Sequence, residues 1–313
     1  MPGSRIVSLL PSATEILCAL GLRDRIVGVS HECDHPSSVR GLPVVTATHV
    51  DAFASSDEID RQVRDLVGQG LSLYRIDEAK LRELAPDLIV TQDVCAVCAV
   101  SLAQVQEATC ALLGASVTIC SLAPKTVQDV LADMVRVAEA AGVPGRGLAL
   151  RTELEARLQR LAAHTAAMPR PTTLFLEWLD PPMVAGHWTP ELLRFAGGEP
   201  ILGHDGAPTG AIAWSSIIEA DPEVLILAPC GFPIAQTLRE LPKLAARPGF
   251  CTMRAVLRGQ VYAVDGNQFF NRPGPRLIDS AEIAAAILHP GSGAARKWPD
   301  DIFSHLTDFC GSR

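Results

Sequence analysis

No cluster of basic residues occurs anywhere in this sequence. Its 313 residues include 27 basic and 35 acidic side chains, which give a formal net charge of −8. Surfaces that bind nucleic acid concentrate lysine and arginine, so we expect no nucleic-acid partner. No segment is long and apolar enough to cross a bilayer, and we therefore expect no membrane insertion.

The motifs of common catalytic sites are also missing. The sequence has no glycine-rich phosphate loop, no His-Glu-x-x-His helix and no nucleophile elbow. We therefore expect a protein that is not an enzyme. A metal-dependent enzyme of unknown reaction remains an alternative, because acidic, histidine and cysteine residues occur in several candidate loops.

The cysteines and the N-terminus indicate a cellular compartment. An odd number of cysteines, several inside apolar segments, is typical of a reducing compartment and not of a disulfide framework. Residues 5–22 are apolar, but Pro11 and Glu15 interrupt them and no basic segment precedes them, unlike a signal peptide. We expect a cytoplasmic protein, or a periplasmic one if a leader has been removed. The cysteines are Cys18, Cys33, Cys95, Cys98, Cys110, Cys120, Cys230, Cys251 and Cys310.

Strand-like and helix-like segments alternate along most of the chain. Such alternation predicts mostly parallel sheets covered by helices on both faces. Ser12 is expected to cap the first helix, with Glu15 completing a capping box. The expected strands are 5–10, 26–29, 44–45, 88–90, 117–120, 172–178, 224–227 and 261–264. The expected helices are 13–19, 59–67, 78–84, 101–113, 124–141, 148–167, 189–195, 214–220, 234–246 and 276–288.

A long amphipathic helix separates two runs of this alternation. Leucines recur at helical spacing along 148–167, which predicts one buried face. We therefore expect an α/β protein of two Rossmann-like lobes with mostly parallel sheets, joined by one long α-helix. The tail 291–313 is expected to fold as a short packing helix. The domains are an N-terminal lobe 1–142, a bridging helix 143–169 and a C-terminal lobe 170–313.

Two loops of the first lobe carry groups that bind soft metals. Cys95 and Cys98 follow the strand 88–90, while His31 and Cys33 follow the strand 26–29. Imidazole and thiolate ligands suit zinc, copper or cobalt, so these residues form a candidate transition-metal site. Buried small side chains or a redox dithiol are the alternatives for the cysteine pair, and a polar turn is the alternative for the histidine loop.

Several segments resemble class III substrate-binding proteins, a family with a helical backbone between its lobes. The resemblance rests on IVSLLPSATE at 6–15, GVS at 28–30, APDLI at 85–89 and the long central helix. NRPGPR at 271–276 is similar to the cobalamin-binding branch, and the resemblance covers about residues 5–289. It implies two lobes, limited hinge motion and a shallow cleft that holds a cobalamin-like corrinoid or another metal chelate.

The resemblance also implies docking to a permease, as in ABC transporters, through one surface glutamate on each lobe. These positions fall near Ala79 and Ser215 in this sequence. Glu78 is adjacent to the first position, but no acid is adjacent to the second. This departure puts docking to a permease in doubt.

Aromatic side chains of the second lobe are candidate ligand contacts. Trp178 and Trp188 offer faces that could stack on a flat macrocycle, and His187 could coordinate a metal axially. The alternative for Trp188 and His187 is structural, because both directly precede an expected helix.

The remaining candidates lie in two loops. Phe269 and Phe270 match an aromatic pair of the family, while Asn271 and Arg272 suit the peripheral amide and phosphate groups of a corrinoid. Glu32 lies in the segment 30–36, where the family offers an aromatic to the corrin ring, and is a further candidate contact. The alternative for the 267–276 loop is a surface loop in which Arg276 pairs with an acid of the lobe.

Overall fold

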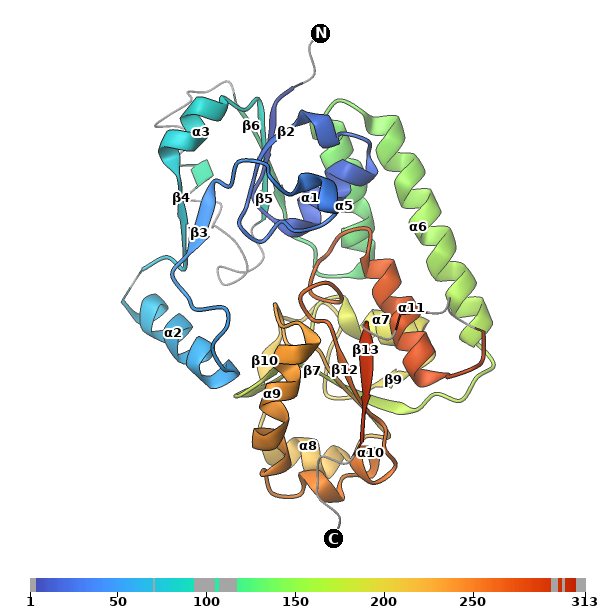
Figure 1. The fold of residues 1–313 in the computed structure, drawn as a ribbon. Coiled ribbons are helices and arrows are strands. Elements are labelled where there is room, and N and C mark those ends of the chain that lie inside the picture. Colours follow the sequence, from blue (N-terminus) through green and yellow to red (C-terminus); the bar gives the residue numbers. More distant parts are fainter. Residues whose placement is uncertain are drawn as a thin grey trace.

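The chain folds into two α/β lobes beside one long helix. The structure, a computed structural model, describes residues 4–69, 71–92, 105–106, 117–293, 298–299 and 302–307. The lobes lie one above the other in Figure 1, and the helix runs along one side of both. The predicted fold class, two α/β lobes joined by a long helix, is therefore confirmed.

The first lobe contains a parallel sheet. Its described strands follow the order β2 (Ile26–Val29), β1 (Ile6–Ser8), β5 (Leu88–Gln92) and β6 (Thr118–Leu122), with every pair parallel. All residues of β1 and β5 are buried, as expected for apolar strands covered on both faces. A separate antiparallel pair joins β3 (Thr46–Thr48) to β4 (Tyr74–Ile76).

Helices cover this sheet on both faces. Thr126 caps α5, since its hydroxyl accepts a hydrogen bond from the backbone N–H of Asp129 at 3.2 Å and the Asp129 carboxylate accepts one in return. The described helices of this lobe are α1 (Pro11–Ala19), α2 (Ser56–Gly68), α3 (Glu78–Leu84) and α5 (Val127–Ala140), with short 3-10 turns at Arg23–Arg25 and Ser37–Val39.

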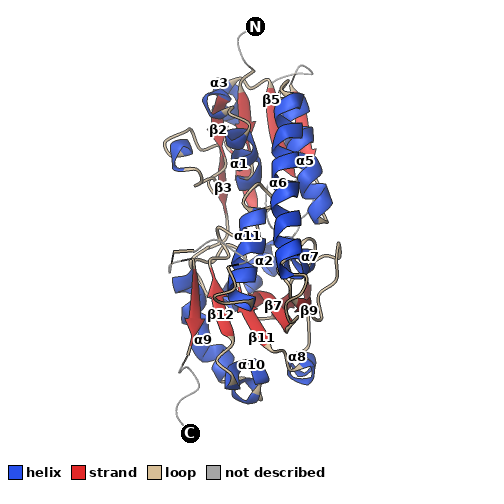
Figure 2. Cartoon of the chain, turned by 90° about the vertical axis from the view of Figure 1, so that its right-hand side faces the viewer, coloured by secondary structure: helices blue, strands red, loops and turns tan. Residues whose placement is uncertain are grey.

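The long helix α6 (Pro144–Thr165) passes from the first lobe to the second (Figure 2). It begins with a proline, which is favourable in the first turn because that position needs no backbone N–H donor. Its leucine face is buried against helices of both lobes. Arg157 donates to Asp279 at 2.6 Å and to Glu282 at 2.7 Å, which fixes α6 to the last helix of the second lobe.

The second lobe has a mixed sheet with a parallel centre. Parallel pairs join β7 (Thr172–Leu179), β11 (Val224–Leu227) and β12 (Val261–Val264), and the short β9 (Glu199–Pro200) pairs with β7. Antiparallel strands lie at the edges: β8 (Pro182–Val184) and β10 (Gly210–Ala211) at one, and β13 (Phe303–Leu306) at the other. Its helices are α7 (Thr189–Phe195), α8 (Trp214–Ala220), α9 (Ile234–Ala245), α10 (Arg254–Leu257) and α11 (Leu277–Leu288), with a 3-10 turn at Phe250–Thr252.

One apolar core extends through both lobes on the side of α6. It includes Ile16 of α1, Leu131 of α5, Leu158 of α6, Leu192 of α7 and Ile278 of α11, each nearly inaccessible to solvent. Burial of apolar surface stabilises by about 25 cal/mol per Å². Separating the lobes along this side would expose that core to water, so the lobes are firmly held there.

Three sequence predictions are wrong. Helix α1 begins at Pro11, so Ser12 lies inside the helix and does not cap it. Part of the tail forms the strand β13 and not a packing helix, because the open edge of β12 offers it a full ladder of backbone hydrogen bonds. The expectation that the cysteines are reduced is wrong for Cys251, which is disulfide-bonded. It is confirmed for four others, which are free thiols: Cys18, Cys33, Cys120 and Cys230. The predicted helix 101–113 lies almost entirely outside the described residues.

Candidate functional site at the junction between the lobes

The carboxyl ends of the parallel strands of the two sheets face each other. The loop after β2 carries Asp34, and the loop after β12 carries Asn267 and Arg272, which both contact Asp34. Ligands of open α/β sheets bind beside the carboxyl ends of the strands. Gly274 lies so close to Ser12 of α1 that an added Cβ would be 3.3 Å from the Ser12 Cα and carbonyl oxygen. The junction between the lobes is therefore the candidate ligand site.

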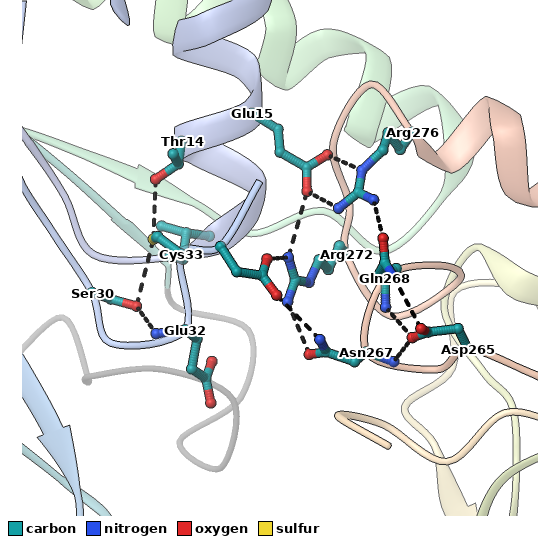
Figure 3. Close-up of polar contacts among 12 residues, drawn as sticks. Thr14, Glu15, Ser30, Glu32, Cys33, Asp265, Asn267, Gln268, Arg272 and Arg276 are labelled. Carbon is teal, nitrogen blue, oxygen red and sulfur yellow. Dashed lines mark hydrogen bonds and ion pairs between the residues drawn. The ribbon is translucent and has the colours of Figure 1, made fainter. Parts of the chain in front are cut away.

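Two arginines of the second lobe, the buried Arg272 and the partly buried Arg276, bind acids of the first (Figure 3). Arg276 donates to both carboxylate oxygens of Glu15, at 2.6 and 3.0 Å. Arg272 donates to Asp34 at 2.5 Å and lies 3.7 Å from Glu15. Arg272 is 7% exposed and Glu15 is 4% exposed, so water does little to screen these two charges, whereas the Asp34 side chain is 43% exposed. We call Glu15, Asp34, Asn267, Arg272 and Arg276 the arginine network.

Hydrogen bonds within the 265–276 loop hold the arginines in place. The Asn267 amide oxygen accepts from Arg272 at 2.9 Å, and the Gln268 amide oxygen accepts from Arg276 at 3.2 Å. Asp265 accepts from the backbone N–H groups of Asn267 and Gln268 at 3.0 and 2.9 Å. Each guanidinium group therefore has protein partners in both lobes.

The pKa of Asp34 lies below its ordinary value of 3.8. Burial by itself would raise this pKa, but the hydrogen bond and the charge of Arg272 outweigh burial. The same contacts hold the pKa of Arg272 above its ordinary value, although burial opposes this shift. Both groups are therefore charged, and they attract each other across the junction.

Most of the predicted ligand contacts of the second lobe are buried and engaged with the protein. Phe270 packs on Phe175 with ring centroids 4.8 Å apart, and Phe269 lies under the Arg276 guanidinium at 5.5 Å. The indole N–H of Trp188 donates to the Phe270 carbonyl at 2.7 Å.

The Asn271 side chain also bonds to the protein, through backbone carbonyl groups of the second lobe. Its side-chain amide donates to the carbonyl oxygens of Ala228 and Gly266 at 3.2 and 2.9 Å. Asn271, Phe269, Phe270 and Trp188 thus shape the edge of the lobe from beneath its surface, and their predicted ligand contacts stay predictions.

Trp178 differs from these residues because it is only half buried. It lies at the carboxyl end of β7, where its ring meets Phe232 edge-on with centroids 5.2 Å apart. Its indole N–H donates to the Asp180 carbonyl at 3.2 Å, which fixes the orientation of the ring. Trp178 therefore retains accessible surface, whereas Trp188 is buried.

In the first lobe, the predicted site residue His31 lies in the loop after β2, at the junction between the lobes. The Thr46 hydroxyl lies 3.1 Å from its backbone nitrogen and 2.8 Å from its ring Nδ1. Burial lowers the pKa of His31, so its imidazole is neutral at neutral pH. Its buried Nε2 has no hydrogen-bond partner among the described residues and lies 4.0 Å from Oε1 of Glu32. Burial also raises the pKa of Glu32, against the opposing charge of Arg272.

Cys33 points into the first lobe. Its thiol accepts a hydrogen bond from the Thr14 hydroxyl at 3.1 Å and lies 3.6 Å from the Ser30 hydroxyl. Burial raises the pKa of this thiol, so it is protonated at neutral pH and is not prepared as a thiolate ligand.

The described residues bring no three potential metal ligands together. His187 belongs to the turn before α7, where burial and then Lys125 of the first lobe lower its pKa. Cys95 and Cys98 lie outside the described residues. The predicted metal site therefore stays a prediction.

A second contact between the lobes was not predicted. Residues 52–57, at the start of α2, lie against Gln236, Glu240 and Lys243 of α9. The sequence signal for it is weak, because polar residues spaced three and four apart on a helix are typical of a solvated face. We call this the α2–α9 contact.

The surface positions that the resemblance assigns to permease docking are both exposed. Ala79 and its neighbour Glu78 lie in the first turn of α3, and Ser215 lies in the first turn of α8. Docking itself is untested and stays in doubt. Among the residues that the structure describes, no helix combines the length and apolarity that a bilayer crossing requires.

Comparison with known proteins places this arrangement among solute-binding proteins. A family model described as "Periplasmic binding protein" matches residues 6–267. A Vitamin B12-binding protein of Vibrio cholerae serotype O1 is 24% identical over 290 residues, which cover 92% of this chain and 90% of the relative.

Two solved structures share the fold. The periplasmic Vitamin B12 binding protein of Vibrio cholerae matches with a TM-score of 0.64 and 23% identity, over 92% of this chain and 97% of that chain. A periplasmic heme binding protein from Pseudomonas aeruginosa matches with a TM-score of 0.70 and 21% identity, over 96% of this chain and 97% of that chain.

Proposed function

The chain belongs to the periplasmic binding protein family, and we propose that it binds a cobalamin-like corrinoid between its two lobes. Members of this family bind a solute and are not enzymes, in agreement with the sequence prediction. Ligand binding is therefore the general function, and the identity of the ligand is our proposal.

The relatives support a flat metal-bearing macrocycle as the ligand. The relative in Vibrio cholerae is named for vitamin B12, while one of the similar structures is named for heme. Both ligands present a broad ring and peripheral polar groups. An aromatic side chain can cover such a ring while losing little conformational entropy.

The observation that carries the proposal is the position of Trp178. Its half-buried ring lies at the edge of the second lobe that faces the first, and Asp180 and Phe232 hold it in one orientation. His31 and Glu32 follow β2, on the facing edge of the first lobe. A macrocycle stacked on Trp178 would present its metal and its polar groups to this loop.

Titration with cyanocobalamin, followed by absorbance, tests the proposal. We expect a saturable spectral change and a higher melting temperature at saturating ligand. Trp178→Ala should weaken binding about tenfold or more, since a buried aromatic contact contributes about 1.5–3 kcal/mol. Trp214→Ala is the matched control, because Trp214 lies in α8 at the far end of the second lobe and should leave binding unchanged (Figure 1).

Two results would overturn the proposal. Cyanocobalamin at saturating concentration without any spectral or thermal effect would remove the corrinoid as ligand, and a parallel titration with hemin would then identify a heme binder. Equal affinities of the wild type and the Trp178→Ala variant would remove Trp178 from the site.

A further inference from the structure

The α2–α9 contact lies on the opposite side of the molecule from α6 (Figure 1). Its three side chains on α9 are Gln236, Glu240 and Lys243, whose spacing places them on one face of the helix. The lobes are therefore joined at two edges of their junction: at the arginine network beside the shared core, and at the α2–α9 contact.

Two buried side chains make the specific hydrogen bonds of this contact. The Gln236 amide donates to the carbonyl oxygens of Ala52 and Ala54, at 3.0 and 3.1 Å. The Glu240 carboxylate accepts from the Ser56 hydroxyl at 2.6 Å and from the Ser56 backbone N–H at 3.4 Å. Glu240 thus lies at the N-terminus of α2, where the helix dipole favours a negative charge.

The rest of the contact is polar and open to solvent. Lys243 forms an ion pair with Asp57, and both side chains are more than 40% exposed. Phe53, which lies within the contacting segment, is 83% exposed and packs on neither lobe. Val63 and Leu66 of α2 pack against the first-lobe core. No described apolar residue of α2 belongs to the core of the second lobe.

The two edges would respond differently to a separating force. Opening the α6 side would expose the shared apolar core and leave the buried Arg272 and the partly buried Arg276 without their acids. Opening the α2–α9 contact would exchange a few hydrogen bonds for bonds with water, which costs much less. The α2–α9 edge is therefore the weaker of the two.

We propose that the α2–α9 contact is the edge of the junction that opens, and that it must separate before a ligand enters or leaves. This inference rests on the proposed function only in placing the ligand at the junction. The separation moves α2 away from α9 while the arginine network stays intact.

Alkylation of Cys230 tests the opening without any ligand. Cys230 is a free, half-buried thiol directly after β11, and its backbone N–H donates to the Glu177 carbonyl at 3.0 Å. With N-ethylmaleimide and site-resolved mass spectrometry, we expect Glu240→Ala to raise the alkylation rate of Cys230 about tenfold. A hydrogen bond to a charged group changes the opening equilibrium by roughly this factor. The thiol of Cys18 on α1 is the internal control and should react at an unchanged rate.

Arg239→Ala is the matched control variant. Arg239 also lies on α9 and carries a charge, but it has no hydrogen bond or ion pair to any described residue of α2. Ser56→Ala weakens the same contact from the first lobe, and it replaces Glu240→Ala if that variant does not fold.

Stopped-flow binding of cyanocobalamin tests the second half of the proposal. We expect Glu240→Ala to raise both the association and the dissociation rate severalfold, with a smaller change in Kd, because opening precedes both steps. Arg239→Ala should match the wild type.

The two experiments separate the inference from the proposed function. Unchanged Cys230 alkylation in both Glu240→Ala and Ser56→Ala would overturn the inference, whatever the ligand. Faster alkylation with unchanged cobalamin rates would also overturn it. Faster alkylation in a protein that binds no cobalamin would support the opening edge and reject the corrinoid.

Discussion

The arginine network and the α2–α9 contact join the same two lobes with similar groups in different surroundings. Each combines a carboxylate with a cation and with side-chain amides. The arginine network lies beside an apolar core that both lobes share, whereas the α2–α9 contact has no such core among the described residues. The surroundings of an ion pair, more than its chemistry, therefore decide whether a contact is permanent or can open.

Glu15→Ala should have the largest effect on stability. Removing this acid leaves the buried Arg272 and the partly buried Arg276 beside an empty position, and breaking a buried ion pair in this way costs about 3–5 kcal/mol. Denaturant unfolding measures the loss. Glu155→Ala is the control, since Glu155 forms a partly exposed pair with Arg151 on the same helix and should change stability by less than about 0.5 kcal/mol. A loss below about 1 kcal/mol for Glu15→Ala would contradict the contrast between the two edges.

Ser56→Ala should have an intermediate effect. It removes one donor from the buried carboxylate of Glu240, which costs about 1–3 kcal/mol, although the Ser56 backbone N–H remains. Hydrogen exchange should show the change as faster exchange in α2, with the amides of α11 unaffected. A global loss as large as that of Glu15→Ala would show that both edges belong to one cooperative unit.

Acid should weaken the arginine network. The pKa of Asp34 is lower in the folded protein than its ordinary value of 3.8, so its contribution to stability is complete above that value and is lost as the pH falls below it. Asp34→Asn should therefore be less stable than the wild type at pH 6, and the gap should narrow toward pH 3. Unfolding curves at several pH values measure it, and a gap that widens in acid would contradict the assignment.

Lys243→Ala should have the smallest effect. Both side chains of its ion pair with Asp57 are more than 40% exposed. We therefore expect the free energy of unfolding to fall by about 0.5 kcal/mol or less, and 0.5 M salt should remove this difference by screening. Melting temperatures at low and high salt measure it. A loss that persists in high salt would indicate that the α2–α9 contact is better shielded than its exposure suggests.

Local sequence patterns predict the elements of this fold well. The bounds of α7, α8, β11 and β12 agree with those expected, because proline, alternation of apolar residues and turn residues act within a few positions. The helix α6 begins four residues earlier than expected because Pro144 is accepted in its first turn.

Side chains that act across the junction were predicted less well. Glu15 has the spacing of a capping box, yet it pairs with Arg276, 261 residues away. Arg272 lies in the loop after β12 of the second lobe, yet it pairs with Asp34, 238 residues away. No pattern within a few residues can record partners that are brought together from the other end of the chain.

Local patterns predicted two α/β lobes and a long helix between them, since periodicity and turn chemistry act over a few residues. The likeness to class III substrate-binding proteins came from the motifs at 6–15, 28–30, 85–89 and 271–276. The tertiary structure decided which charged groups face solvent and which face each other. It assigned Arg272 and Arg276 to acids of the first lobe, left Trp178 half accessible and placed α2 against α9. These outcomes depend on burial and on distances between segments far apart in sequence, and only the packed chain contains that information.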